Sequence, residues 1–404
     1  MNHHKFAKLS VLSILIVSLL GLLMRYKIGF TFPFLDQKFL QLSHSHFAFA
    51  GWVSFTLMLL MSVFLQKNAT DFTSKKYSTF LYAQLAVAFG MLVSFIIQGY
   101  GLISIFLSSS SIFISFFFAY IYFQDLKKIT LKTGAEKWFI AALGFYIFSN
   151  VGTFLLIYMM ATKTTDQHIY LGSLYWYLHF QYNGWFFFAI MGLFISSLKE
   201  QFPQLVIPKI VFRGFAISCV PAVGLSVLWL NLPLWMFVFV VIAAILQTYS
   251  WIRFIQTLVK VQFFKLTTIG NIAKWLMLLV AFSMSIKLLL QLGSVFPALS
   301  KLAFGFRPIV IAYLHLILLA IISVYLLAEL IAQKLIVLTG LATVGVLVFV
   351  VGVYLNELML GIQGIASLSY TVVPFVNELL FIITFIIVVG LLLLNISQFK
   401  KNAS

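Results

Sequence analysis

His44-Ser45-His46-Phe47-Ala48-Phe49-Ala50-Gly51-Trp52 is a stretch whose pattern returns twice further along the chain. The second copy, residues 177–185, keeps the histidine, the aromatic residue after it and the Gly-Trp pair five and six residues on. The third copy, residues 313–316, shares Tyr-Leu-His with the second but lacks the Gly-Trp pair. The histidines of the three copies lie 133 and 136 residues apart, which predicts a unit of about four membrane helices used three times. These histidines are His46, His179 and His315.

Composition places the chain in a lipid bilayer. The 404 residues have a mean hydropathy of +1.09, with 63% hydrophobic and 9% charged residues, whereas soluble domains carry about 25% charged residues. Apolar runs of about 20 residues cross the hydrocarbon as helices, because lipid cannot satisfy exposed backbone polar groups. The expected partner is therefore the membrane itself. The net charge of +17 is interpreted as a topology signal, and no nucleic-acid partner is expected.

Hydropathy together with Pro, Gly and charge positions predicts an all-α integral membrane protein of twelve transmembrane helices, arranged in three pseudo-repeated four-helix arcs. The chain forms a single membrane domain over 1–404, with pseudo-repeats at about 1–135, 136–265 and 266–404. The first apolar run is interpreted as a retained helix rather than a cleaved signal peptide. The expected helices lie at roughly 8–29, 44–66, 77–99, 102–124, 138–160, 175–197, 208–230, 233–254, 271–293, 308–331, 335–357 and 376–396.

The distribution of Lys and Arg predicts the orientation. Of the 26 such residues, 19 fall on the side of the N-terminus, six on the opposite side, and Lys287 lies inside a helix. Because cytoplasmic loops are enriched in Lys and Arg, we expect both termini in the cytoplasm of a bacterial-type plasma (inner) membrane, crossed many times.

This orientation places the three histidines at one depth. The helices at 44–66, 175–197 and 308–331 then run from outside to inside, with a histidine in the first turns of each. Intramembrane histidines are functional candidates by default. Neutral imidazoles from two facing helices can ligate a haem iron. A copper or zinc site, a proton relay and plain hydrogen bonding between helices are the alternatives.

Two further residues bear on the site. His44 and His46 point about 200° apart on a regular helix, so they cannot face one centre together. We favour His46 as the ligand because it aligns with the other two histidines. Lys287 lies deep in its helix and is interpreted as a proton-path residue, a partner for a haem propionate, or a structural hydrogen-bond donor.

Twelve helices in three arcs, with these histidines near the outer ends of the second, sixth and tenth helices, resemble the main subunit (subunit I) of the haem-copper oxidases, including the nitric oxide reductase large subunit. The resemblance covers the whole chain in topology and a few residues in motif. It implies that His46 and His315 bind a low-spin haem and that His179 is a ligand of the active-site metal.

The chain departs from that family at the catalytic centre. Tyr313 stands where the family has the first histidine of a His-x-His pair, and residues 208–230 contain no histidine. The paired arginines expected near the propionates are absent. Arg25, Lys301 and Arg307 are the candidates to substitute for them, and a surface charge at a helix end is the alternative interpretation of each. The active site is therefore expected to be degenerate. The chain is also similar in this respect to the NnrS-type membrane haem proteins linked to nitric oxide stress.

The expected function is that of a haem-binding membrane protein of electron transfer, or of nitric oxide or oxygen redox chemistry. If it is an enzyme, it is a respiratory-type oxidoreductase. The cofactor is a b-type haem bound by His46 and His315, with His44, Tyr313 and Arg307 nearby. A second metal, copper or iron, would sit at His179. The electron donor would be a quinol or a cytochrome, and other membrane subunits are conceivable partners. The alternatives are a twelve-helix secondary transporter and a non-catalytic haem-handling subunit.

Overall fold

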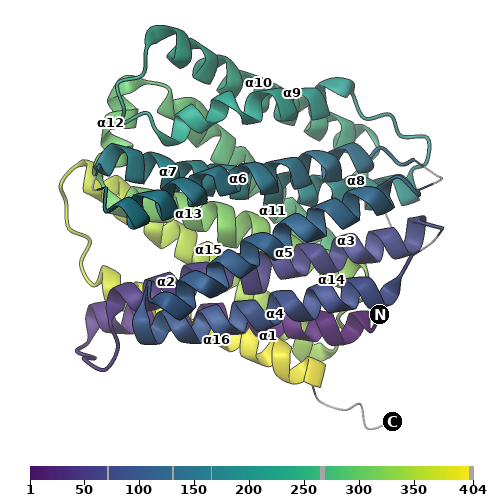
Figure 1. Ribbon diagram of the computed structural model, residues 1–404, viewed down its shortest axis with the longest axis horizontal. Helices are drawn as coiled ribbons and strands as arrows, with labels where there is room; N and C mark the ends of the chain where they lie inside the picture. Colours follow the sequence, from purple (N-terminus) through teal and green to yellow (C-terminus); the bar gives the residue numbers. More distant parts are fainter. Residues whose placement is uncertain (71, 130–131, 165, 264–268, 400–404) are drawn as a thin grey trace. The chain divides into compact units, whose positions relative to one another are not determined.

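The computed structural model is helical wherever the sequence has a long apolar run (Figure 1). It describes residues 1–70, 72–129, 132–164, 166–263 and 269–399, without the side chains of 301–304. No strand occurs in these ranges. Ten of the described helices are long and apolar enough to cross a membrane. The all-helical class and the multi-pass membrane character are thus confirmed. The number of twelve helices and their grouping in three arcs stay predictions.

The chain divides into two compact units, which are described separately. Unit 1 comprises residues 1–120 and 323–404, and unit 2 comprises residues 121–322. Unit 1 contains α1 (His3–Gly29), α2 (Gln37–Phe47), the π-helical segment η1 (Ala48–Ser54), α3 (Phe55–Asn68), α4 (Ser74–Gln98), most of α5 (Leu102–Leu126), α14 (Val324–Ala332), α15 (Gly340–Leu368) and α16 (Val376–Phe399).

Unit 2 holds the middle of the chain. It contains α6 (Glu136–Thr162), α7 (Gln167–His179), the π-helical segment η2 (Phe180–Phe186), α8 (Phe187–Gln201), α9 (Lys209–Cys219), the 3-10 segment η3 (Pro221–Ser226), α10 (Leu234–Lys260), α11 (Asn271–Ser294), α12 (Pro297–Gly305) and α13 (Arg307–His315). A third π-helical segment, η5 (Leu316–Ser323), reaches the boundary between the units.

The predicted helices differ from the structure in several places. Those expected at 44–66 and 175–197 begin earlier, at Gln37 and Gln167, so His46 and His179 lie nine and twelve residues after these starts and not in the first turns. The segment 208–230 is not one helix, because α9 ends at Cys219 and a short 3-10 turn follows. Pro221 lacks a backbone N–H and its ring clashes with the preceding turn, so it ends the helix. The last but one helix was expected at 335–357 and instead spans Gly340–Leu368, since apolar residues continue past Glu357.

Aspartates fix where two of the motif-bearing helices begin. Asp36 accepts a hydrogen bond from the backbone N–H of Phe39 at 2.9 Å, and Asp166 accepts one from Ile169 at 2.9 Å. Such N-caps satisfy donors that a helix cannot pair internally. They set the register of the helices that carry His46 and His179.

In unit 1, α15 and α16 pack along each other, and α16 also packs against α1. Glycine makes the first contact close: a Cβ on Gly345 would lie 2.7 Å from the backbone N of Leu394 and 2.8 Å from the carbonyl O of Gly390. Small residues let membrane helices approach until their backbones touch, and this contact is stabilised by dispersion rather than by exclusion of water.

We expect Gly345→Leu to destabilise this helix pair, because the new side chain has only backbone to displace. Overpacking of this kind costs about 1–3 kcal/mol. Gly361→Leu, in the same helix but with open space around its Cβ position, is the matched control. Thermal unfolding in detergent, followed by circular dichroism, should show a lower midpoint for the first variant alone. Equal midpoints would contradict the close contact.

Candidate functional site

Each of the three motif histidines stands one or two residues before a π-helical segment. His46 precedes η1 by two residues, and His179 and His315 directly precede η2 and η5. π-helical turns are rare and occur frequently at functional sites, because the inserted residue breaks the regular hydrogen-bond ladder and re-aims side chains. The shared feature therefore marks the same place in all three copies of the sequence pattern.

The tryptophans of the motif anchor two of these segments. Trp52 in η1 is 2% exposed, and its indole N–H donates to Oγ of Ser323 at 2.9 Å within unit 1. Trp185 in η2 is fully buried, and its ring stacks on Tyr146 of α6 at 4.5 Å between centroids. In η1, the side-chain amide of Gln84 donates to the backbone carbonyl of Ala50 at 2.9 Å. A carbonyl of the π-helical segment thus gains a partner from α4.

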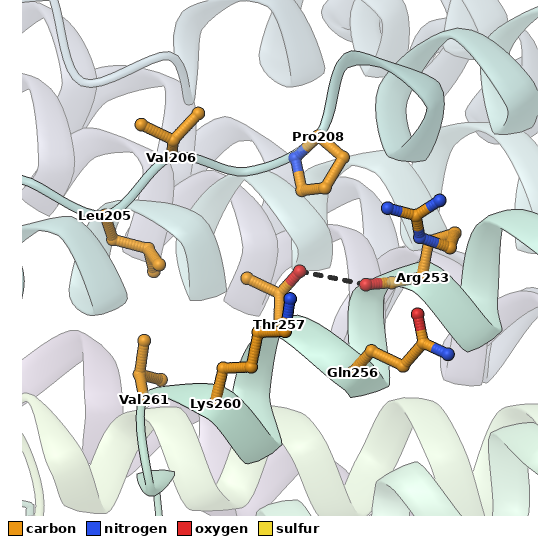
Figure 2. Close-up of a pocket in the computed structure, with 8 residues that line it drawn as sticks. All are labelled: Leu205, Val206, Pro208, Arg253, Gln256, Thr257, Lys260 and Val261. Atoms are coloured by element: carbon orange, nitrogen blue, oxygen red, sulfur yellow. Dashed lines mark hydrogen bonds between the residues drawn. The ribbon is translucent and has the colours of Figure 1, made fainter.

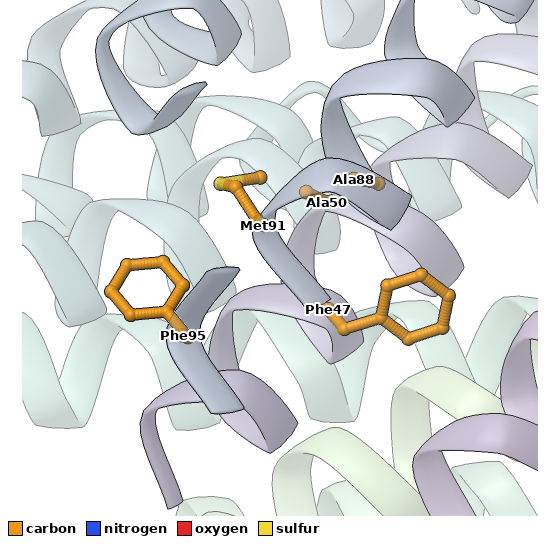
Figure 3. Packing of buried hydrophobic residues seen from close by; sticks show 5 residues of the cluster. All are labelled: Phe47, Ala50, Ala88, Met91 and Phe95. Carbon is orange, nitrogen blue, oxygen red and sulfur yellow. The ribbon is translucent and has the colours of Figure 1, made fainter. Parts of the chain in front are cut away.

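In unit 1, His44 and His46 face different neighbours, as expected from helix geometry. His44 Nδ1 lies 3.1 Å from the backbone carbonyl O of Val17 in α1. His46 stacks on Phe95 of α4, with 4.2 Å between ring centroids, and its Nε2 lies 3.3 Å from the hydroxyl of Tyr100. Phe95 also belongs to the apolar cluster in Figure 3, in which α4 packs against Phe47 of α2 and Ala50 of η1.

The hydrogen bond to a carbonyl determines the tautomer of His44. A carbonyl oxygen only accepts, so Nδ1 of His44 carries the proton and Nε2 carries the lone pair. His315 has the same arrangement, because its Nδ1 lies 2.9 Å from the carbonyl O of Ile311 one turn earlier. A Nδ1–H bonded to a backbone carbonyl is the usual orienting contact of a histidine that offers Nε2 to a metal.

The other residues predicted around His315 lie on the same short helix of unit 2. Tyr313 is half-buried, two residues before His315. Arg307 is the first residue of α13 and is exposed, as expected of a charge at a helix end. His46 belongs to unit 1 and His315 to unit 2, so their pairing on one haem stays a prediction.

His179 belongs to a buried hydrogen-bond chain in unit 2. Lys287 Nζ donates to Oδ1 of Asn183 at 2.7 Å, and Nδ2 of Asn183 lies 3.1 Å from Nδ1 of His179. His179 Nε2 lies 2.9 Å from the carbonyl O of Cys219. All four residues are at most 7% exposed.

The end groups force one direction on this chain. An ammonium only donates and a carbonyl only accepts, so Nδ2 of Asn183 donates to Nδ1 of His179, and Nε2 of His179 donates to Cys219. Both ring nitrogens of His179 are thereby engaged. A metal on His179 would have to displace one of these partners. Lys287 was predicted as a proton-path residue, a propionate partner or a structural hydrogen-bond donor. In this structure it donates a hydrogen bond to the neighbouring Asn183.

Sequence reasoning missed two members of the chain. Asn183 lies four residues after His179 inside the quoted motif, so the signal was present: a polar amide on the same helix face as a membrane-embedded histidine. Cys219 contributes its backbone carbonyl at the last residue of α9, directly before the break at Pro221. Any residue type has a backbone carbonyl, so this role depends on where α9 ends and could not be predicted from the cysteine itself.

The motif glycines serve packing of aromatic rings. A Cβ on Gly51 would lie 2.6 Å from the ring of Phe47 in the same helix, and a Cβ on Gly184 would lie 2.6 Å from Cβ of Phe145 in α6. Among the described residues, no group of three or more His, Cys, Asp and Glu side chains is placed to hold a metal ion. No protein-family model matches the chain, and no curated protein matches it.

We expect Asn183→Leu to destabilise unit 2 by about 1–3 kcal/mol, because it leaves the buried ammonium of Lys287 and Nδ1 of His179 without their partner. The double variant Asn183→Leu/Lys287→Met should recover part of this loss, since removing both partners also removes the unpaired ammonium. Thermal unfolding in detergent measures the difference.

Asn150→Leu is the matched control for this prediction. Asn150 is equally buried in unit 2, but its amide donates only to the carbonyl of Tyr146 in its own helix. A double variant less stable than Asn183→Leu would show that Lys287 does not depend on Asn183.

Proposed function

We propose that this chain is a membrane haem protein in which a histidine of α2 and His315 of α13 are the axial ligands of a b-type haem. The observation that carries the proposal is the recurrence of a histidine one or two residues before a π-helical segment, at three places 133 and 136 residues apart. A structural histidine has no reason to coincide three times with so rare a helical form. The twelve-helix arrangement in three arcs is part of this proposal.

The tautomers support ligand roles for His315 and for one histidine of α2. The contact of His315 Nδ1 with the carbonyl O of Ile311 is the orienting contact that an axial histidine makes. In α2 the repeat register assigns the ligand to His46, whereas the hydrogen bond to Val17 gives His44 the same proton position as His315. With His46 as ligand through Nε2, the hydroxyl of Tyr100 would have to move away. Variants of the two histidines separate these assignments.

A bis-histidine haem would supply one-electron transfer, and the protein would exclude water from the haem and bind its propionates. The aromatic and aliphatic side chains around η1 exclude water, as an apolar cofactor requires. Arg307, exposed at the head of α13, is available to a propionate. The donor would be a quinol or a cytochrome in a bacterial-type plasma membrane, with both termini cytoplasmic.

His179 decides between electron transfer and turnover of a gas. A second metal there would have to break either the contact with Asn183 or that with Cys219. We therefore propose electron transfer as the main role. Reaction with nitric oxide or oxygen would require a second centre that uses a rearranged His179.

A secondary transporter is the second candidate, and one observation favours it. Transporters of this size use helices broken near the membrane midplane, where freed backbone groups contact the substrate. The segment after α9 is broken at Pro221, and the carbonyl of Cys219 just before the break is bonded to His179. On this reading Lys287 and Asn183 would contact an anionic substrate.

The test is a reduced-minus-oxidised optical spectrum of the purified protein, made with ample haem supply. We expect a sharp low-spin b-type signal that is lost in His315→Ala and in one of His44→Ala and His46→Ala. His168→Ala, a change at an exposed histidine, is the control and should keep the signal.

A folded, colourless protein would overturn the haem proposal and leave the transporter. A haem signal that survives in all three ligand variants would overturn the ligand assignment. Loss of folding is recognised separately by gel filtration and circular dichroism, so it cannot be mistaken for loss of a ligand.

A further inference from the structure

The end of α10 carries a polar stripe in a helix that is otherwise apolar. Arg253, Gln256, Thr257 and Lys260 follow the i, i+3, i+4, i+7 spacing and therefore share one helix face. The segment Leu234–Lys260 is one of the ten candidate membrane spans. Arg253 lies seven residues before its end, about 10 Å inside at 1.5 Å per residue. A guanidinium at that depth needs an anion or water.

This stripe forms one wall of a pocket of about 150 Å³ in unit 2. The opposite wall is the segment after α8, which contributes Leu205, Val206 and Pro208, and Val261 closes the lower end (Figure 2). The pocket thus pairs a basic wall with an apolar one. Thr257 Oγ1 donates to the carbonyl of Arg253 at 2.9 Å, so its hydroxyl proton is used within the helix.

Among the described residues, no carboxylate neutralises the cationic groups of this pocket. Arg253 donates to the hydroxyl of Tyr249 at 3.1 Å, and neither Arg253 nor Lys260 pairs with a carboxylate in the part of the chain that the structure describes. More positive charge stands beside it. Ser250 of α10 donates to the carbonyl of Ile210, which brings the start of α9 with Lys209 and Arg213 alongside.

The surroundings indicate a ligand with acyl chains. On α10, Ile252 is 48% exposed and Val259 is 62% exposed, and both flank the stripe. Val206 on the opposite wall is 82% exposed. Such apolar exposure on a candidate membrane span is a surface for lipid. The acyl chains of a lipid whose phosphate is held by Arg253 and Lys260 would therefore extend directly into hydrocarbon.

We propose that this pocket binds the phosphate of an anionic glycerophospholipid at the cytoplasmic surface of the membrane, with Arg253 and Lys260 as the anion ligands. Basic pockets between membrane helices on this side are suited to anionic headgroups. Arg253 offers a planar fork of donors that matches two phosphate oxygens, and Lys260 adds a mobile point charge. The site is independent of haem binding.

The test uses the full-length protein, stripped of lipid in detergent, and native mass spectrometry with phosphatidylglycerol or phosphatidylcholine. We expect phosphatidylglycerol to be retained preferentially. Arg253→Gln/Lys260→Gln should weaken its retention by about twenty-fivefold, at about fivefold for each charge removed. Lys127→Gln/Lys132→Gln, which removes two exposed charges predicted on the same side of the membrane, should leave it within about twofold.

Three results would overturn the proposal. The first is equal retention of the two lipids, and the second is an unchanged double variant. The third is inorganic phosphate that binds to the protein and displaces phosphatidylglycerol, which would identify a soluble phosphate as the ligand. If the double variant does not fold, Lys260→Gln changes an exposed side chain only and should still weaken retention about fivefold.

Discussion

Hydrocarbon offers no hydrogen bonds, and this constraint governs every feature of the protein that departs from a plain apolar helix. A π-helical segment interrupts the regular ladder of backbone hydrogen bonds, so the groups it releases need partners from elsewhere in the chain. Gln84 supplies one to Ala50 of η1. In η1, α4 therefore provides the donor that the irregular backbone needs.

The same constraint explains the hydrogen-bond chain of unit 2. Lys287 is buried, its ammonium donates to Oδ1 of Asn183, and Nδ2 of Asn183 donates onward to His179. The break of the helix at Pro221 then leaves the carbonyl of Cys219 available as the last acceptor. Each member is satisfied only because the next one is present. The four hydrogen-bonded residues therefore depend on one another, and removal of the amide of Asn183 affects both Lys287 and His179.

Much of the architecture could be predicted from the sequence, because apolar runs of about 20 residues cross a bilayer as helices. Half of the expected helices agree with the structure within three residues at both ends. In the described residues, a π-helical segment follows each of His46, His179 and His315, but the spacing of these histidines did not predict that form. The form itself left no signal. Helices such as Phe55–Asn68 are buried on nearly every face, so they have no amphipathic phase in which an inserted residue could be seen.

What the sequence could not provide were the partners. His44 and His46 were correctly expected to point apart, but only the fold shows that one meets a carbonyl of α1 and the other meets Phe95 and Tyr100. Asn183 was visible beside His179, whereas the contribution of Cys219 depends on a helix end set by Pro221. The prediction of a continuous helix at 208–230 was wrong for the same reason, because Pro221 ends the helix although the residues around it are apolar.

The central claim is that histidines beside π-helical segments hold a haem by two imidazoles. Electron paramagnetic resonance of the oxidised protein tests it most directly, since the spin state of ferric haem reports its axial ligands. The account predicts a low-spin ferric signal that becomes high-spin when His315 is replaced by alanine. A well-folded protein with no haem signal, or a high-spin signal already present before any substitution, would contradict it.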